Sequence, residues 1–342
     1  MSGAGTADGS GTRVSPGAAG GPVTDVLTFG ETMAALRGSG PLRLGGTMEL
    51  SVAGAESNVA IGLARLGHRV RWAGAVGDDE AGELVLRTLR AEGVDVALAS
   101  RDAGAPTGLL LFEPRLPDVT RVHYYRTGSA GSRLTADAVE RAFTAGGPPR
   151  VLHLTGITAA LGEAPRAACE RALRLAREHG TWVCLDVNHR SRLWSRDEAA
   201  AVLRSWAPYA DVLIASDDEL PLCLGPSDGP VADLPSQAKE LLGRGVSEVV
   251  VKLGARGATA YTAQGELHFP ARPVRAVDPV GAGDAFVAGY LSALLDGVDA
   301  AGRLDRAVTC GAFAVAGRGD WEGAPTRAEL GLLGEGDGTV VR

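Results

Sequence analysis

Short, almost continuously apolar runs alternate along this chain with segments whose apolar residues recur at helical spacing. Such runs are typical of strands that are covered on both faces. Their alternation with helices predicts an α/β fold, in which a mostly parallel sheet carries helices on both faces. The expected strands are Asp25–Gly30, Arg69–Gly77, Val151–Gly156, Trp182–Asn188, Asp211–Ser216 and Glu248–Gly254. The expected helices are Glu56–Leu66, Glu80–Glu92, Ala167–His179, Gln237–Leu242 and Asp284–Leu295.

Two segments, residues 31–52 and 105–126, do not fit the alternation and read as short strands with turns. We expect them to form a small extra sheet over one edge of the main fold. No fixed-period repeat or low-complexity linker divides residues 23–335, which predicts one domain. Residues 1–22 contain almost no large side chain and are expected to form a disordered tail, with a second tail at 336–342.

Composition excludes several classes of partner. The 342 residues carry a net charge of −7, which gives no electrostatic support to binding nucleic acid or an anionic membrane. No apolar run approaches the roughly 18 residues of a membrane helix, and no secretory signal opens the chain. The four cysteines form no C-x-x-C pair and lie in apolar runs, as reduced core residues do. These features predict a cytoplasmic protein that acts on small molecules.

The segment Asp278-Pro-Val-Gly-Ala-Gly-Asp284 precedes a helical run and carries the strongest chemical signal. The small residues Gly281, Ala282 and Gly283 let the backbone approach an anion closely, and the first N–H groups of a helix favour negative charge. Asp284 at the mouth of this anion hole would repel phosphate, but it makes sense as the base for an attacking hydroxyl. The alternative interpretation is an ordinary Asp helix cap flanked by glycines.

Two other nucleotide-binding motifs fail on spacing. A dinucleotide fingerprint needs a third glycine where Phe286 stands, which argues against a dinucleotide-dependent oxidoreductase. A Walker A loop needs Gly-Lys followed by Ser or Thr, and neither lysine of the chain supplies it.

The glycine-rich loop resembles the C-terminal signature of the ribokinase family, also called the phosphofructokinase-B family of carbohydrate kinases. That signature centres on D-T-x-G-A-G-D, and here Pro279 stands where Thr is usual. The resemblance runs from about Val23 to about Leu333 and implies a ribokinase-like fold, Rossmann-like with a small β-sheet lid from about 31–52 and 105–126. Further motifs follow in the order of the family: Asp25–Glu31, Ala53–Asn58, Ile61–Gly67, Val76–Asp78 and Val251–Gly257.

The resemblance implies transfer of a phosphoryl group from MgATP to a sugar hydroxyl, with Asp284 as base and Gly281–Gly283 as anion hole. Glu219 matches the Glu of the family's N-x-x-E motif, which holds magnesium indirectly, although Ser216 replaces its Asn. A monovalent cation near Asp278 and a homo-oligomer through the lid are also compatible with it. The residues implied on the nucleotide side are Ser216, Lys252, Gly254, Gly257 and Gly283.

Within the family, three strings are similar to the branch that phosphorylates 2-keto-3-deoxygluconate to its 6-phosphate. They are Gly54–Asn58, Tyr124–Ser132 and Asp186–Arg190 with the Leu193-Trp194 that follows. This sugar has a carboxylate that fructose and ribose lack, and arginine binds carboxylate with a planar pair of donors. The residues implied around the sugar are Gly54, Asn58, Tyr124, Arg126, Ile157 and Arg190.

Other interpretations stay open at this point. Arg190 has Arg192 and Arg196 nearby, as in a solvated basic turn, and Arg126 fits an ordinary surface residue. Leu110 and His189 stand where members often carry Tyr, which bears on the choice of sugar. The alternative substrates are those of a fructokinase, ribokinase or nucleoside kinase. A sugar-binding or regulatory protein without catalysis is a different class, against which the base beside the anion hole argues.

Overall fold

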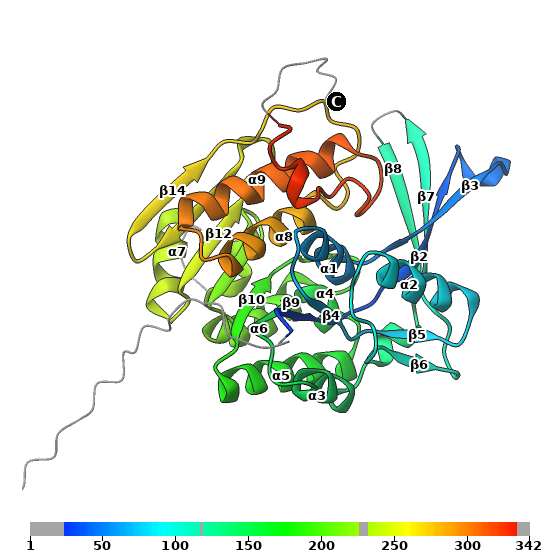
Figure 1. The fold of residues 1–342 in the computed structure, drawn as a ribbon, viewed down its shortest axis with the longest axis horizontal. Coiled ribbons are helices and arrows are strands. Elements are labelled where there is room, and N and C mark those ends of the chain that lie inside the picture. Colours follow the sequence, from blue (N-terminus) through cyan, green and yellow to red (C-terminus); the bar gives the residue numbers. More distant parts are fainter. Residues whose placement is uncertain (1–23, 117–118, 226–231, 334–342) are drawn as a thin grey trace, which may run out of the picture.

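The computed structural model describes residues 24–116, 119–225 and 232–333. Its centre is an eight-stranded sheet in which the strands from β12 to β4 run parallel and β13 and β14 are antiparallel (Figure 1). The predicted α/β class is therefore confirmed. In sheet order the strands are β14 (Gly265–Phe269), β13 (Ala258–Thr262), β12 (Glu248–Lys252), β11 (Val212–Ser216), β10 (Trp182–Asp186), β9 (Val151–Thr155), β1 (Val26–Thr28) and β4 (Val70–Trp72).

Helices cover both faces of this sheet, because successive strand residues point to opposite sides. Val26 packs in one apolar cluster and Leu27 in the other. One face carries α1 (Ala55–Arg65), α2 (Glu80–Ala91), α8 (Ala282–Leu295) and α9 (Ala300–Ala316). The other face carries α3 (Ala136–Thr144), α4 (Gly156–Ala160), α5 (Glu163–His179), α6 (Arg196–Trp206) and α7 (Leu234–Gly243). None of the helices in the described ranges combines the length and the apolar character needed to cross a bilayer.

A second sheet of four strands, in the order β3-β2-β7-β8, stands to one side of the main sheet (Figure 1). It confirms the small sheet predicted from residues 31–52 and 105–126, and we call it the small sheet below. Its own apolar centre is only a few residues, including Met33, Leu110 and Phe112. Its strands are β2 (Met33–Gly38), β3 (Met48–Ala53), β7 (Leu109–Leu116) and β8 (Val119–Tyr125).

Several expected boundaries were wrong. The run Arg69–Gly77 is two strands, β4 and β5 (Ala75–Gly77), and β5 pairs with β6 (Ser100–Asp102) instead of the main sheet. They separate at Gly74, where a side chain would meet the Trp72 ring at 2.0 Å. Helix α8 begins at Ala282, two residues before the predicted start. The two predicted tails lie outside the described residues.

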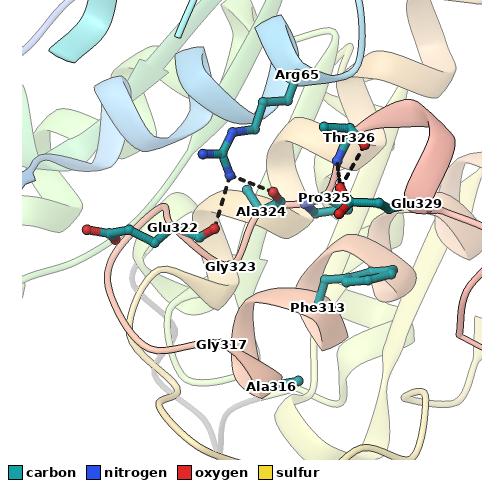
Figure 2. Close-up of a pocket in the computed structure, with 10 residues that line it drawn as sticks. All are labelled: Arg65, Phe313, Ala316, Gly317, Glu322, Gly323, Ala324, Pro325, Thr326 and Glu329. Carbon is teal, nitrogen blue, oxygen red and sulfur yellow. Dashed lines mark hydrogen bonds between the residues drawn. The ribbon is translucent and has the colours of Figure 1, made fainter. Parts of the chain in front are cut away.

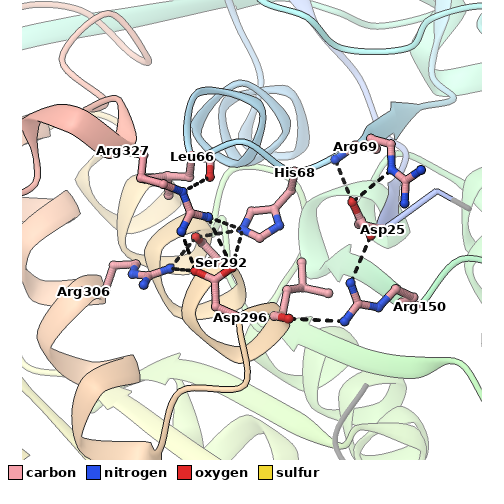
Figure 3. Close-up of polar contacts among 10 residues, drawn as sticks. Asp25, Leu66, His68, Arg69, Arg150, Ser292, Asp296, Arg306 and Arg327 are labelled. Atoms are coloured by element: carbon pink, nitrogen blue, oxygen red, sulfur yellow. Dashed lines mark hydrogen bonds and ion pairs between the residues drawn. The ribbon is translucent and has the colours of Figure 1, made fainter. Parts of the chain in front are cut away.

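A polar network closes the end of the fold where α8 finishes (Figure 3). Asp296, the C-cap of α8, accepts hydrogen bonds from Arg306 at 2.5 Å and Arg327 at 2.7 Å. Arg327 also donates to the carbonyl of Leu66 at 2.8 Å, next to α1. Burial alone would raise the pKa of Asp296, but hydrogen bonds from Arg327 and Arg306 lower it overall. The network thus fixes the far end of α8, whose amino end lies at the site described next.

Candidate active site

The amino end of α8 is shaped by a glycine. Gly281 is the N-cap with φ of +74°, a left-handed conformation that favours glycine, and a Cβ there would lie 1.7 Å from the Asp320 carbonyl oxygen. Ala282 and Gly283 form the first turn of the helix itself, not a loop ahead of it. The N–H groups of such a first turn have no acceptor inside their helix, so this point of the molecule suits an anion.

Asp284 follows in the same turn and is 8% exposed. Asn58 of α1 donates to its Oδ2 from Nδ2 at 2.8 Å. Burial raises the pKa of Asp284 to about 7, with Asp186 adding to the rise, while the Asn58 hydrogen bond, Arg190 and Lys252 oppose it. A carboxyl group with such a pKa exchanges protons readily at neutral pH, as a general base must.

An ion pair lies beside this carboxylate. Asp186, fully buried at the carboxyl end of β10, accepts from the Lys252 ammonium at 2.8 Å and from the Asn188 amide at 3.3 Å. Burial alone would lower the pKa of Lys252, but the charges of Asp186, Glu219 and Asp284 raise it overall. Asn188 has φ of +39°, a conformation rare outside glycine and often found at functional sites.

Glu219 joins the ends of two neighbouring strands. Its Oε1 accepts from the His189 backbone N–H at 2.7 Å, and its Oε2 accepts from that of Ser216 at 2.9 Å. The Ser216 hydroxyl donates to Asp218 at 2.6 Å. Within the described ranges no group of three or more His, Cys, Asp or Glu could hold a metal alone. With both oxygens engaged, Glu219 suits an indirect contact with magnesium better than direct ligation.

The two glycines expected on the nucleotide side shape the connection from β12 to β13. Gly254 has φ of +59° and Gly257 has φ of +95°. A Cβ at Gly257 would lie 2.0 Å from the Phe269 carbonyl oxygen. The turn alone therefore explains Gly257, and contact of either glycine with a nucleotide stays a prediction.

Gly54 and Ile157 each stand at the start of a helix. Gly54 is the N-cap of α1, where a Cβ would lie 2.4 Å from the Glu31 carbonyl oxygen. Ile157 belongs to the first turn of α4, and its N–H donates to the Thr155 hydroxyl at 3.1 Å. Ile157 follows the carboxyl end of β9 in the main sheet, where ligands of open α/β sheets bind, whereas Gly54 follows β3 of the small sheet.

The two expected arginines differ in their surroundings. Arg126 is paired at 2.5 Å with Glu31, a residue only 2% exposed, and its guanidinium lies 5.7 Å from the centre of the Tyr124 ring. Arg190 is exposed but near enough to Asp284 to lower the pKa of that carboxyl. Arg190 is thus the more available donor for a ligand carboxylate. Arg192, its neighbour, donates to the Val122 carbonyl of the small sheet at 2.9 Å.

A cavity of about 540 Å³ lies elsewhere, between the end of α1 and the loop after α9 (Figure 2). Its lining includes Arg65, Phe313 and Glu329, and none of the residues expected to bind sugar or nucleotide. We place the active site at Asp284 nevertheless, because the charged groups and the open helix start gather there.

Several residues of this site were not predicted from the sequence. Asp186 and Asn188 belong to one of the strings that carry the resemblance, and their place at a strand end could have singled them out. Arg37 of β2 donates to Asp278 at 3.2 Å and to Asp320 at 2.5 Å, next to the start of α8, but it gave no local signal because these partners are 241 and 283 positions away in the chain.

The site and the fold together combine an open α/β sheet with a helix start that suits an anion and a buried carboxylate beside it. Residues 23–327 match the pfkB family of carbohydrate kinases, and the chain belongs to that family. It is a carbohydrate kinase, as its sequence predicted.

Two relatives carry the same name. The 2-dehydro-3-deoxygluconokinase of Thermoproteus tenax is 38% identical over 296 residues, 85% of this chain and 87% of that protein. The 2-dehydro-3-deoxygluconokinase of Bacillus subtilis (strain 168) is 38% identical over 316 residues, 90% of this chain and 94% of that protein. Their name denotes the kinase of 2-keto-3-deoxygluconate.

Solved structures show the same fold. A protein of E. coli named Ribokinase II, in complex with ATP and Mg²⁺, has a TM-score of 0.83 and 26% identity over 91% of this chain and 99% of that one. A fructokinase double mutant of Vibrio cholerae O395, bound to fructose, ADP and potassium, has a TM-score of 0.77 and 25% identity over 91% and 98%.

Proposed function

We propose that this protein phosphorylates 2-keto-3-deoxygluconate at its 6-hydroxyl with ATP, and that Asp284 is the base. One observation carries the proposal: a buried carboxylate, held by Asn58 and with its pKa raised to about 7, stands in the first turn of a helix, where N–H groups without acceptors inside the helix suit phosphate. A protein that only binds sugar has no need of a base at such a place.

In the proposed reaction the sugar hydroxyl gives its proton to Asp284 while its oxygen attacks the γ-phosphorus. The bond from that phosphorus to the bridging oxygen breaks, and ADP leaves. Asn58 orients the carboxylate, and the N–H groups from Gly281 to Gly283 stabilise the charge on the transferred group. Lys252 supplies positive charge beside the same helix start, since a side chain on Gly283 would lie 3.7 Å from its ammonium.

ATP and magnesium fit this arrangement. Magnesium in kinase sites rests largely on phosphate oxygens and water, with one or two carboxylates, and it neutralises phosphate charge when bound. Glu219 is the carboxylate proposed to face its water shell. Ser216, Gly254 and Gly257 are proposed to line the nucleotide, in the same part of the sheet edge as Lys252.

The choice of sugar acid is supported by the two relatives at 38% identity and by the exposed guanidinium of Arg190 near Asp284. We assign the carboxylate of the sugar to Arg190, because Arg126 already neutralises Glu31. Gly54, Asn58, Tyr124 and Ile157 are proposed to line the rest of the sugar. A fructose, ribose or nucleoside substrate is the alternative.

Three further points concern a monovalent cation, the assembly and the location of the protein. The potassium of the fructokinase neighbour suggests a monovalent cation near Asp278, but Oδ2 of Asp278 already accepts from Arg37 at 3.2 Å and Oδ1 from the Val280 N–H at 3.1 Å, so that cation is not part of the proposed reaction. Exposed apolar side chains of the small sheet, such as Leu50 at 60% and Tyr125 at 63%, support an oligomer through the lid. The buried free cysteines support a cytoplasmic location.

The deciding experiment measures ATP consumption over a panel of 2-keto-3-deoxygluconate, its epimer 2-keto-3-deoxygalactonate, fructose, ribose and nucleosides. We expect the highest kcat/KM for a keto-deoxy sugar acid, with the 6-phosphate identified by phosphorus NMR. A preference for fructose would overturn the sugar assignment but leave the kinase. Absence of turnover on every sugar would overturn the proposed reaction and the role of Asp284 in it.

A further inference from the structure

Arg37, on β2 of the small sheet, reaches two carboxylates that belong to different segments of the chain. Its guanidinium donates to Asp278 at 3.2 Å and to Asp320 at 2.5 Å, and it lies 3.9 Å from the centre of the Phe112 ring. The side chains of the two aspartates are 18% and 10% exposed, and that of Arg37 is 15% exposed. This shielding makes the contact stronger than an ordinary surface ion pair.

Both aspartates adjoin the helix start proposed to bind phosphate. Asp278 opens the turn that ends at Gly281, and it holds that turn by accepting the Val280 N–H. The Asp320 backbone lies directly against Gly281, since a Cβ on that glycine would come within 1.7 Å of the Asp320 carbonyl oxygen. A shift of either segment would therefore change the contacts of the first turn of α8.

The loop that carries Asp320 is also held from its other sides. Arg65 of α1 donates to the carbonyls of Glu322 at 3.1 Å and Ala324 at 2.7 Å (Figure 2). The Trp321 indole donates to the Val52 carbonyl of the small sheet at 3.1 Å. These contacts fix the path of the loop, but none of them offsets the charge of Asp278 or Asp320.

The negative charges of Asp278 and Asp320 still have to be balanced next to the start of α8. Burial raises the pKa of Asp320 to about 6, while Arg37 opposes the rise and Glu322 and Asp278 add to it. At neutral pH the charges of Asp320 and Asp278 thus oppose each other beside the proposed phosphate site, because like charges repel. Arg37 supplies the positive charge that lets both remain.

We propose that Arg37 is a positioning residue that fixes the helix start of α8 through Asp278 and Asp320 and couples it to the small sheet. The inference deepens the proposed kinase function and rests on it. Because the guanidinium already occupies both carboxylates, this chain carries its own cation between the two segments. Phosphoryl transfer should then not depend on potassium.

The test compares Arg37→Met, Arg37→Lys and a matched control, Arg121→Met, an exposed arginine of β8 in the same sheet. Turnover is measured in potassium and in tetramethylammonium buffers. Wild type should be equally active in both. Arg37→Met should lose roughly 10- to 100-fold in kcat, the size of one charge-assisted contact, with a much smaller change in KM for the sugar. Added guanidinium or potassium should restore part of the loss, and Arg121→Met should behave as wild type.

A double variant separates positioning from simple damage to the fold. Removing one buried carboxylate, as in Asp320→Asn, should reduce the cost of Arg37→Met, because an uncompensated charge is the reason for that cost. Two results would overturn the proposal. One is a wild-type kcat in Arg37→Met. The other is a loss of kcat that neither guanidinium nor potassium rescues and that Asp320→Asn does not reduce. A wild type that needs potassium would overturn it as well.

Hydrogen exchange distinguishes failure of this inference from failure of the kinase proposal. It needs no substrate. Amides 278–284 should exchange faster in Arg37→Met than in wild type, and guanidinium should reverse the change. If the wild type phosphorylates no sugar and this exchange result still holds, the kinase proposal fails and the role of Arg37 stands. Unchanged exchange at 278–284 would sink the positioning role whatever the activity.

Discussion

At Asp284, the proposed role as a catalytic base should come with a cost to the stability of the folded protein. Burial and the charge of Asp186 favour the protonated form of the Asp284 carboxyl, whereas Asn58, Arg190 and Lys252 favour the ionised form. A base with a pKa near the working pH is effective, yet an ionised carboxylate in such a place is less favourable than in the unfolded chain. The two consequences can be measured on one variant.

The first prediction concerns turnover. Asp284→Asn should lower kcat by about 10²–10⁴-fold, the usual contribution of a general base, and should leave sugar and ATP binding nearly intact. In wild type, kcat/KM should fall with unit slope as the pH drops through about 7, where Asp284 becomes protonated. Turnover with calorimetric binding on the same sample checks this. Near wild-type turnover in the variant would remove Asp284 from the mechanism.

The second prediction concerns the stability of the same variant. The folded-state pKa of Asp284, about 7, lies above its ordinary value of 3.8, so ionisation destabilises the folded protein as the pH rises from about 4 to about 7. Asp284→Asn should therefore stabilise the protein by roughly 1–4 kcal/mol above pH 7, with the gain vanishing toward pH 4. Denaturant unfolding at several pH values measures it. A destabilised variant at pH 8 would show that the carboxylate is well accommodated.

The third prediction concerns Arg190. Arg190→Ala should lower kcat/KM for 2-keto-3-deoxygluconate by tens- to hundreds-fold, since a charge-assisted hydrogen bond is worth roughly 1.5–3 kcal/mol. Any activity on fructose should fall much less, and Arg190→Lys should rescue only partly. Assays at pH 8.5 limit the effect of Arg190 on the Asp284 pKa. The control is Arg196→Ala, because Arg196 is also exposed and donates to the protein itself, at the Asp218 carbonyl. Equal losses of kcat/KM on both sugars would show that a residue other than Arg190 binds the carboxylate.

Among the elements, the small sheet is the one that we expect to move. Its apolar centre is small, and polar contacts such as Arg126 to Glu31 and Arg192 to the Val122 carbonyl tie it to the main body. Elements held in this way open more easily than strands buried on both faces. They suit a lid that closes over a substrate.

The fourth prediction follows from this construction. Saturating sugar should protect β7 and β8 from hydrogen exchange, because closure shields their backbone hydrogen bonds. Strand β10, buried on both faces, serves as the internal control and should not change. Equal exchange in β7 and β8 with and without substrate would count against a mobile lid.

The elements also show how far the sequence could lead. Strands such as β9 and β11 were predictable, because burial on both faces makes them continuous apolar runs. Strand β14 is almost wholly exposed, and α6 has only a few buried residues, so neither produced a recognisable pattern. In the site, Asp284 and its glycines were predictable from local spacing. The contact of Arg37 with Asp278 and Asp320 was not, because only tertiary structure brings these residues together.

On the scale of the whole molecule, α8 connects two places with different tasks. Its amino end carries the proposed anion hole, and its C-cap Asp296 lies in the network with Arg306 and Arg327 at the opposite end (Figure 3). That network joins α8 to α9, to the segment after α9 and, through the Leu66 carbonyl, to α1. Stability and catalysis should therefore separate along the length of this one helix.

The last prediction tests that separation with Asp296→Asn. Arginine pairing lowers the folded-state pKa of Asp296, so the stabilisation is present above its unfolded pKa of about 3.9 and is lost as the pH falls through the lower folded value. At pH 7 we expect a loss of roughly 1–3 kcal/mol in the free energy of unfolding, which shrinks below pH 4, and a nearly unchanged kcat. The control is Asp305→Asn, which breaks an exposed pair with Arg272 and should cost under about 0.5 kcal/mol. A fall in kcat without a loss of stability would show that the far end of α8 controls the active site. Equal losses of unfolding free energy in Asp296→Asn and Asp305→Asn would show that the network is no stronger than a surface ion pair.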